Sequence, residues 1–80
     1  MIALLQKQVL EKKELADGYS FQFMGSDLII DQLTEFVKTE RQCCEFFTFA
    51  IHVSDEKSII WMDLTGPPGT EDFIENELGF

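Results

Sequence analysis

Residues 27–44 form one long amphipathic segment, and this segment limits what the rest of the chain can fold into. When the segment is read as a helix at about 100° per residue, its apolar side chains fall on one stripe roughly 120° wide. The stripe consists of Ile29, Leu33, Phe36, Val37, Cys43 and Cys44. Such a stripe has to be buried against another layer of secondary structure. The chain therefore needs a sheet or a second helix to cover it.

Glu40 interrupts this stripe near its middle. It lies one turn before two adjacent cysteines, so its carboxylate can approach Cys43 (i+3) and Cys44 (i+4). A carboxylate on an apolar helix face needs hydrogen-bond partners. Glu40, Cys43 and Cys44 are therefore the candidate functional site of this chain.

Four short segments around the helix have the composition of strands. Apolar and polar residues alternate in residues 19–24 and 58–64, and residues 46–53 carry an unbroken apolar face. Residues 9–15 have a mixed composition that would also allow a helix, but a strand is favoured because Asp17-Gly18, a strong hairpin turn signal, follows. We expect these segments to form two hairpins, one before and one after the helix.

A short helix is expected at the end of the chain. The sequence Gly66-Pro67-Pro68-Gly69 breaks the last strand, and Thr70 is suited to cap a helix beyond it. The expected order is ββαββα in a single α+β domain over residues 1–80. The simplest arrangement is one four-stranded, mostly antiparallel sheet with two helices on one face.

The two cysteines are predicted to be free thiols. Neighbouring Cα atoms are about 3.8 Å apart, whereas a disulfide usually needs about 4.4–6.8 Å. Free thiols favour a reducing, cytoplasmic setting. Cys43 and Cys44 could bind a thiophilic metal ion or sense thiol oxidation. Alternatively, both are small core hydrophobes and Glu40 is a structural carboxylate.

An enzyme is the less favoured reading. Glu40 as general base and Cys44 as nucleophile would need a third, orienting group, and none is evident. The end of a helix also disfavours a thiolate. The sequence shows no Ser/His/Asp set, and Gly66–Gly69 lacks the N–H donors of a phosphate loop.

The sheet face opposite the helices is expected to be unusually apolar. By strand parity it carries Phe46, Ala50, His52, Ile59 and Trp61. This is too apolar for the freely solvated face of a monomer, so either the N-terminal segment or a second subunit covers it. We expect a homodimer, joined through Phe46, His52, Ile59 and Trp61 or through an edge strand beside them. His52 is too far along its strand from Cys44 to share a zinc site.

The charge of the chain excludes several partners. A net charge of −9 argues against nucleic acid and anionic membranes, which bind clustered Lys and Arg. No apolar run approaches the length of a membrane span, and the first residues do not have the basic start of a signal peptide.

Residues 40–49 (ERQCCEFFTF) and 64–69 (LTGPPG) resemble a group of small, uncharacterised bacterial proteins. These proteins carry an E-R-x-C-C-P-F core and a later L-T-G-P-x-G turn, and Asp17-Gly18-Tyr19 matches their usual start. The resemblance covers most of the chain. It implies a stand-alone cytoplasmic domain, but no particular activity. This chain differs at Glu45, where proline is common; the change softens the helix stop and adds a second carboxylate beside the thiols.

Overall fold

A computed structural model describes residues 2–43 and 45–79 of the chain. The elements are α1 (Ile2–Gln8), β1 (Glu11–Leu15), β2 (Gly18–Met24), α2 (Asp27–Cys43), β3 (Thr48–Ser54), β4 (Ile59–Thr65), α3 (Thr70–Phe73) and η1 (Ile74–Leu78), a turn of π-helix. The α+β class and the order ββαββα are confirmed, with α1 added in front of them.

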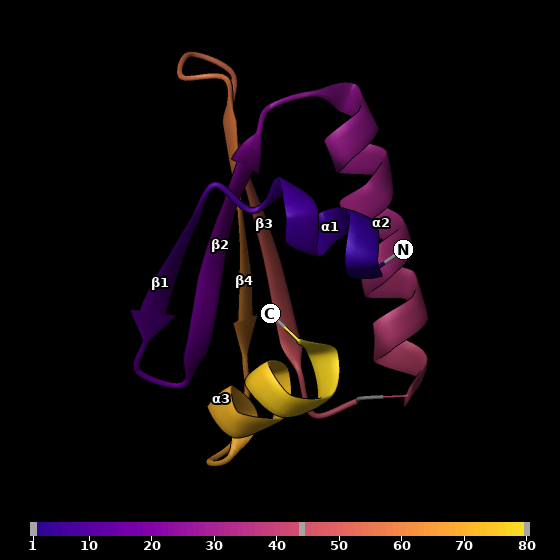
Figure 1. Cartoon of the computed structure of the whole chain (residues 1–80), viewed down its shortest axis with the longest axis vertical. Helices are drawn as coiled ribbons and strands as arrows, with labels where there is room; N and C mark the ends of the chain where they lie inside the picture. Colours follow the sequence, from indigo (N-terminus) through magenta and orange to yellow (C-terminus); the bar gives the residue numbers. More distant parts are fainter. Residues whose placement is uncertain (1, 44, 80) are drawn as a thin grey trace.

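The four strands form one antiparallel sheet in the order β1-β2-β4-β3. β2 and β3 both run antiparallel to β4, so they are parallel to each other and separated by it. α2 connects them across the sheet, which makes a split β-α-β unit (Figure 1). β1 and β3 are the two edges of the sheet.

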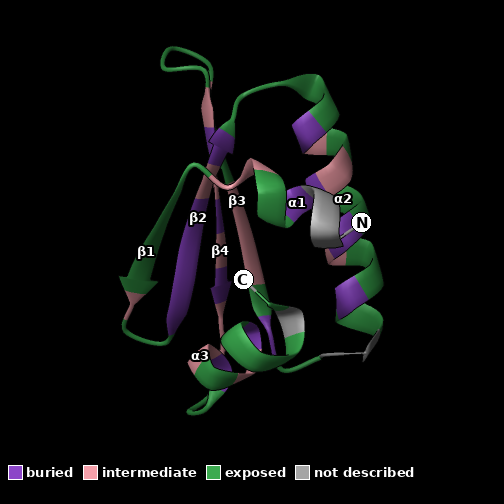
Figure 2. Ribbon diagram, in the orientation of Figure 1, coloured by how far each residue is buried: buried purple, intermediate pink, exposed green. Residues whose placement is uncertain are grey.

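The core lies between the sheet and the helices. Every second residue of β2 and β4 belongs to this buried core, as the alternation predicts, and α2 contributes its apolar stripe. Figure 2 shows buried segments along β2 and on α2. The fully buried large side chains are Leu5, Phe21, Phe23, Leu33, Phe36, Ile60, Met62, Leu64 and Ile74. Each stabilises the fold by about 1.5–3 kcal/mol relative to an exposed position.

The N-terminal segment packs on the helix side of the sheet. Leu5 of α1 is completely buried in the core. Gln8 Nε2 donates to Gln32 Oε1 of α2 at 3.0 Å. Residues 2–8 therefore do not cover the opposite sheet face, which was one of the two possibilities that the sequence left open.

Phe46 does not lie where strand parity placed it. β3 begins at Thr48, not at residue 46. The Phe46 ring packs against Phe47 at 4.6 Å and Phe73 of α3 at 5.2 Å between centroids. These ring contacts hold Phe46 beside α3, so it does not share a face with His52.

The start of α3 also differs from the expectation. Gly69 is the N-cap residue, in the left-handed conformation with φ 98°, and Thr70 is the first helical residue. The Thr70 hydroxyl donates to the Pro67 carbonyl oxygen at 2.6 Å. Thr70 thus braces the proline turn and does not cap the helix.

Candidate functional site

Glu40 is buried in the core-facing stripe of α2, as the sequence predicted. It is 8% exposed, and Ile29, Leu33 and Phe36 on the same stripe are buried with it. Among the described residues, no fully buried side-chain oxygen or nitrogen lacks a hydrogen-bond partner, so the Glu40 carboxylate is not an unpaired buried charge. A carboxylate on an apolar helix face is nevertheless costly to remove from water, so Glu40 is an unusual choice at this position.

The two sulfurs of the candidate site are not placed. α2 ends at Cys43, one helical turn beyond Glu40. The side chain of Cys43 and the whole of Cys44 lie outside the described part of the structure. Among the residues that are described, no group of three His, Cys, Asp or Glu side chains could hold a metal ion.

Two adjoining hollows separate α2 from the edge strand β3, and we call them together the α2–β3 groove. The first, of about 450 Å³, lies toward the end of α2 and is lined by Val37, Arg41, Glu45, Phe47 and Phe49. The second, of about 340 Å³, is lined by Thr34, Val37, Lys38, Phe49 and Ile51. The groove is thus aromatic and aliphatic at its base, with Arg41 and Lys38 at its helix side.

The open sheet face carries a polar network that the sequence did not predict. Ser20 Oγ donates to Asp63 Oδ1, and His52 Nε2 lies 2.9 Å from Asp63 Oδ2. Because β4 lies between β2 and β3, Asp63 on β4 can contact Ser20 on one side and His52 on the other. No local sequence pattern reveals this cluster, because it depends on the order of the strands.

This network does not have the arrangement of a catalytic triad. A serine nucleophile needs the imidazole next to its hydroxyl, with the carboxylate behind the imidazole. Here the carboxylate of Asp63 lies between Ser20 and His52. The Ser20 hydroxyl meets a carboxylate and not an imidazole, and the three residues tie neighbouring strands together.

The four residues predicted at an interface do not share one surface. His52, Ile59 and Trp61 lie on the open sheet face, and Phe46 lies beside α3. Trp61 and Ile59 are half-buried and His52 is exposed. Lys13 Nζ lies 4.7 Å from the centre of the Trp61 ring. Trp61 is therefore partly covered by a cation of its own chain.

An acidic corner joins β1 and β2 to the C-terminal helical segments. The Tyr19 hydroxyl donates to Glu75 Oε1 at 2.6 Å, and Lys12 Nζ lies 3.4 Å from the same oxygen. The hydrogen bond to Glu75 raises the pKa of Tyr19 above its usual value. The hydrogen bond from Tyr19 is the main cause that lowers the pKa of Glu75, and the contact with Lys12 lowers it further. A hydrogen bond with Glu14 raises the pKa of Glu71, and burial and nearby carboxylates add to this.

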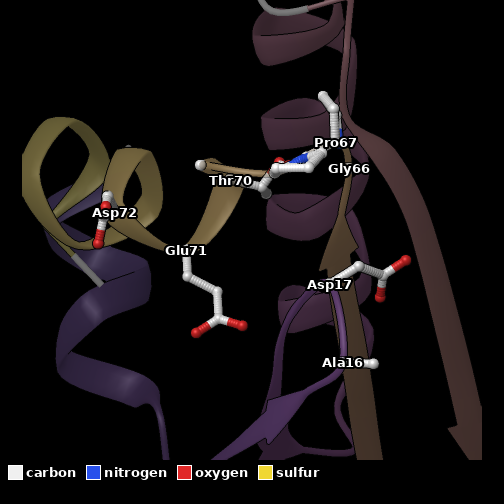
Figure 3. A pocket seen from close by; sticks show the side chains of 9 residues that line it. Ala16, Asp17, Gly66, Pro67, Thr70, Glu71 and Asp72 are labelled. Carbon is white, nitrogen blue, oxygen red and sulfur yellow. Dashed lines mark hydrogen bonds between the residues drawn. The ribbon is translucent and has the colours of Figure 1, made fainter.

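A hollow of about 420 Å³ adjoins the proline turn (Figure 3). Asp17 approaches it from the β1–β2 turn, and Glu71 and Asp72 from α3. Three carboxylates repel phosphate, and Pro67 and Pro68 offer no N–H donors. This geometry fits the sequence interpretation of residues 66–69 as a rigid connection and not as a phosphate loop.

Comparison of the chain with protein-family models, with curated proteins and with solved structures finds no match. Of the helices in the described residues, none has the length and apolar character needed to cross a membrane.

Proposed function

We propose that this chain is a small cytoplasmic, non-enzymatic protein that binds a thiophilic metal ion, or responds to thiol oxidation, through Glu40, Cys43 and Cys44. The proposal rests on Glu40, a carboxylate that is only 8% exposed on an apolar stripe and lies one turn before Cys43, at the end of α2. A cation held by the neighbouring thiols would supply the opposite charge that a buried carboxylate needs.

The chemistry of the three side chains favours soft ions. Thiolates prefer Hg(II), As(III), Cu(I) or Zn(II), and a carboxylate can complete a mixed site. The Cα atoms of neighbouring residues lie about 3.8 Å apart, closer than a disulfide usually needs, so both thiols are expected to stay free as ligands. Oxidation of either thiol would compete with metal binding at the same sulfur.

Metal titration of the reduced protein tests this proposal. We expect a stoichiometric complex with a Kd below about 1 μM, in which both thiols are protected from a thiol reagent. Cys43→Ser with Cys44→Ser should abolish binding, and Glu40→Gln should weaken it. Glu35→Gln, on the exposed face of the same helix, is the matched control and should leave binding unchanged. Two unreactive thiols in the folded protein, with no metal bound below about 1 μM, would exclude the proposal.

A second candidate is an interaction module whose cysteines are only core residues. It is favoured by the half-buried Trp61 and Ile59, which lie on a sheet face that no described helix covers. Replacing Cys43 and Cys44 together by Ala separates the two candidates. An interaction module would lose stability but keep its association, and a thiol site would lose metal binding.

A further inference from the structure

The two edges of the sheet differ sharply in charge. Four of the five residues of β1 are charged (EKKEL), and Figure 2 shows this strand almost wholly exposed. β3 (TFAIHVS) contains no Asp, Glu, Lys, Arg, Pro or Gly. Charged side chains and proline are common devices that keep an exposed edge from pairing with another chain. β1 is protected in this way and β3 is not.

The backbone groups at the β3 edge can be assigned from the ladder. Gly25 N–H donates to Ser58 O at 2.8 Å, and Gly66 N–H donates to Asp17 O at 3.0 Å. The backbone N–H and C=O groups of the even-numbered residues of β4 therefore bond to β2, and those of its odd-numbered residues bond to β3. On β3, the residues that pair with these odd-numbered residues of β4 are the even-numbered ones from 48 to 54. Phe49, Ile51 and Val53 consequently direct their N–H and C=O groups toward the open edge.

The side chains of the same three residues are apolar and incompletely covered. Phe49 and Ile51 are half-buried at the base of the α2–β3 groove, and Val53 is 50% exposed. The hollow beside Ile51 contains no carboxylate, although the chain carries a net charge of −9. This edge thus combines outward-directed backbone groups, exposed apolar surface and, beside Ile51, a hollow without a carboxylate.

We propose that a second copy of this chain pairs antiparallel with β3 about a two-fold axis, and that the two sheets join into one. The axis passes between the two Ile51 residues, so Phe49 lies opposite Val53 of the partner subunit. Each outward residue then exchanges N–H and C=O bonds with its counterpart. A two-fold interface of this kind is self-complementary. The proposal does not depend on the thiol site.

The charge distribution favours a second copy over a basic partner. A basic protein would be attracted to the acidic corner around Glu71 and Glu75, not to β3, which contains no Asp or Glu. For two chains of charge −9, the uncharged β3 edge is a surface where contact brings few like charges together. The open face is less suited, because Ser20, His52 and Asp63 place polar groups at its centre.

Sedimentation from about 1 μM to about 1 mM, combined with residue-level amide exchange, tests the proposal. We expect a concentration-dependent dimer in which the amides of Phe49, Ile51 and Val53 are as protected as those of Ala50 and His52. Val53→Lys should give a folded monomer in which the amides of residues 49 and 51 exchange fast and those of residues 50 and 52 slowly. Val53→Pro, which removes only an outward N–H, should also give a monomer.

Two matched controls separate this edge from other surfaces. Leu10→Lys makes the same charge change at a residue that is 58% exposed elsewhere, and it should leave the dimer intact. Trp61→Glu alters the open face and should also leave it intact. A native protein that stays monomeric to about 1 mM overturns the proposal. A dimer that persists in the Val53→Lys variant also overturns the proposal, as does a dimer that the Trp61→Glu substitution dissociates.

Discussion

Glu40 occupies a core position that an aliphatic residue would fill at lower cost. Its neighbours on the stripe are Leu33 and Phe36, both completely buried. Replacing a buried ionic group by an apolar one of similar volume is often neutral or stabilising. The proposed metal site would account for a carboxylate at this position.

Glu40→Leu should raise the free energy of unfolding of the metal-free protein by about 1–3 kcal/mol, because it removes a buried polar group and extends the apolar stripe. Urea unfolding of the reduced protein measures this. Glu35→Leu on the exposed face should change stability by less than about 0.5 kcal/mol. A Glu40→Leu protein less stable than the native one would show that the carboxylate has a structural partner.

The acidic corner predicts opposite effects for two neighbouring glutamates. The pKa of Glu71 is raised, chiefly by Glu14, so the native state favours its protonated form. Its stabilising contribution is present at low pH and is lost as the pH rises through the folded pKa. The pKa of Glu75 is lowered, chiefly by Tyr19, so its contribution is present at neutral pH and is lost as the pH falls.

Glu71→Gln should therefore raise Tm at pH 7, because a neutral amide can bond to Glu14 without repulsion, and this gain should shrink toward about pH 4. Glu75→Gln, the matched control, should lower Tm at pH 7, because it weakens the contacts with Tyr19 and Lys12. Thermal unfolding of both variants across this range checks the signs. Equal shifts of the same sign would contradict the assignment.

At the scale of elements, the periodicity of the sequence predicted the features that depend only on local residue spacing. The helix at 27–43, the alternation of β2 and β4 and the burial of Glu40 all follow from residue spacing. The predictions that failed concern segments whose structure depends on residues distant in the sequence. Phe46 leaves the strand to meet Phe73, and α1 is buried through Leu5 alone among its described side chains. The Ser20, His52 and Asp63 network needs the strand order, which no local pattern contains.

Gly18 shows the same limit within a correctly predicted hairpin. The sequence assigned it to a turn, but it pairs with Leu15 as the first residue of β2. A Cβ there would lie 1.8 Å from the Leu64 carbonyl oxygen. The glycine is therefore required by the close approach of β4 and not by a left-handed turn.

Gly18→Ala should destabilise the fold by more than about 2 kcal/mol, because the neighbouring strand backbone has to shift. Gly69→Ala is the matched control: its Cβ meets nothing within 4 Å, and only the positive φ of 98° is unfavourable. That conformation costs about 1–2 kcal/mol. Urea unfolding of both variants should show the larger loss for Gly18→Ala; the reverse order would contradict the contact with Leu64.

At the scale of the whole molecule, association has to overcome a net charge of −9 on each chain. The proposed β3 interface is itself uncharged, so the repulsion comes from more distant carboxylates and is screened by salt. Raising the ionic strength from about 10 mM to about 500 mM should therefore strengthen the dimer. Sedimentation at both ionic strengths measures this. A dimer that weakens with salt would indicate an interface held by ion pairs instead.

The position of β4 at the centre of the sheet also has a consequence for the newly made chain. β2 and β3 pair with β4 and not with each other, and Tyr19 meets Leu64 only after most of the sequence has been synthesised. Until residues 59–65 have been synthesised, the central strand is missing, and β2 and β3 have no strand between them to pair with. The complete sheet can therefore form only after nearly the whole chain has been made, and its pairings with β4 join residues far apart in the sequence.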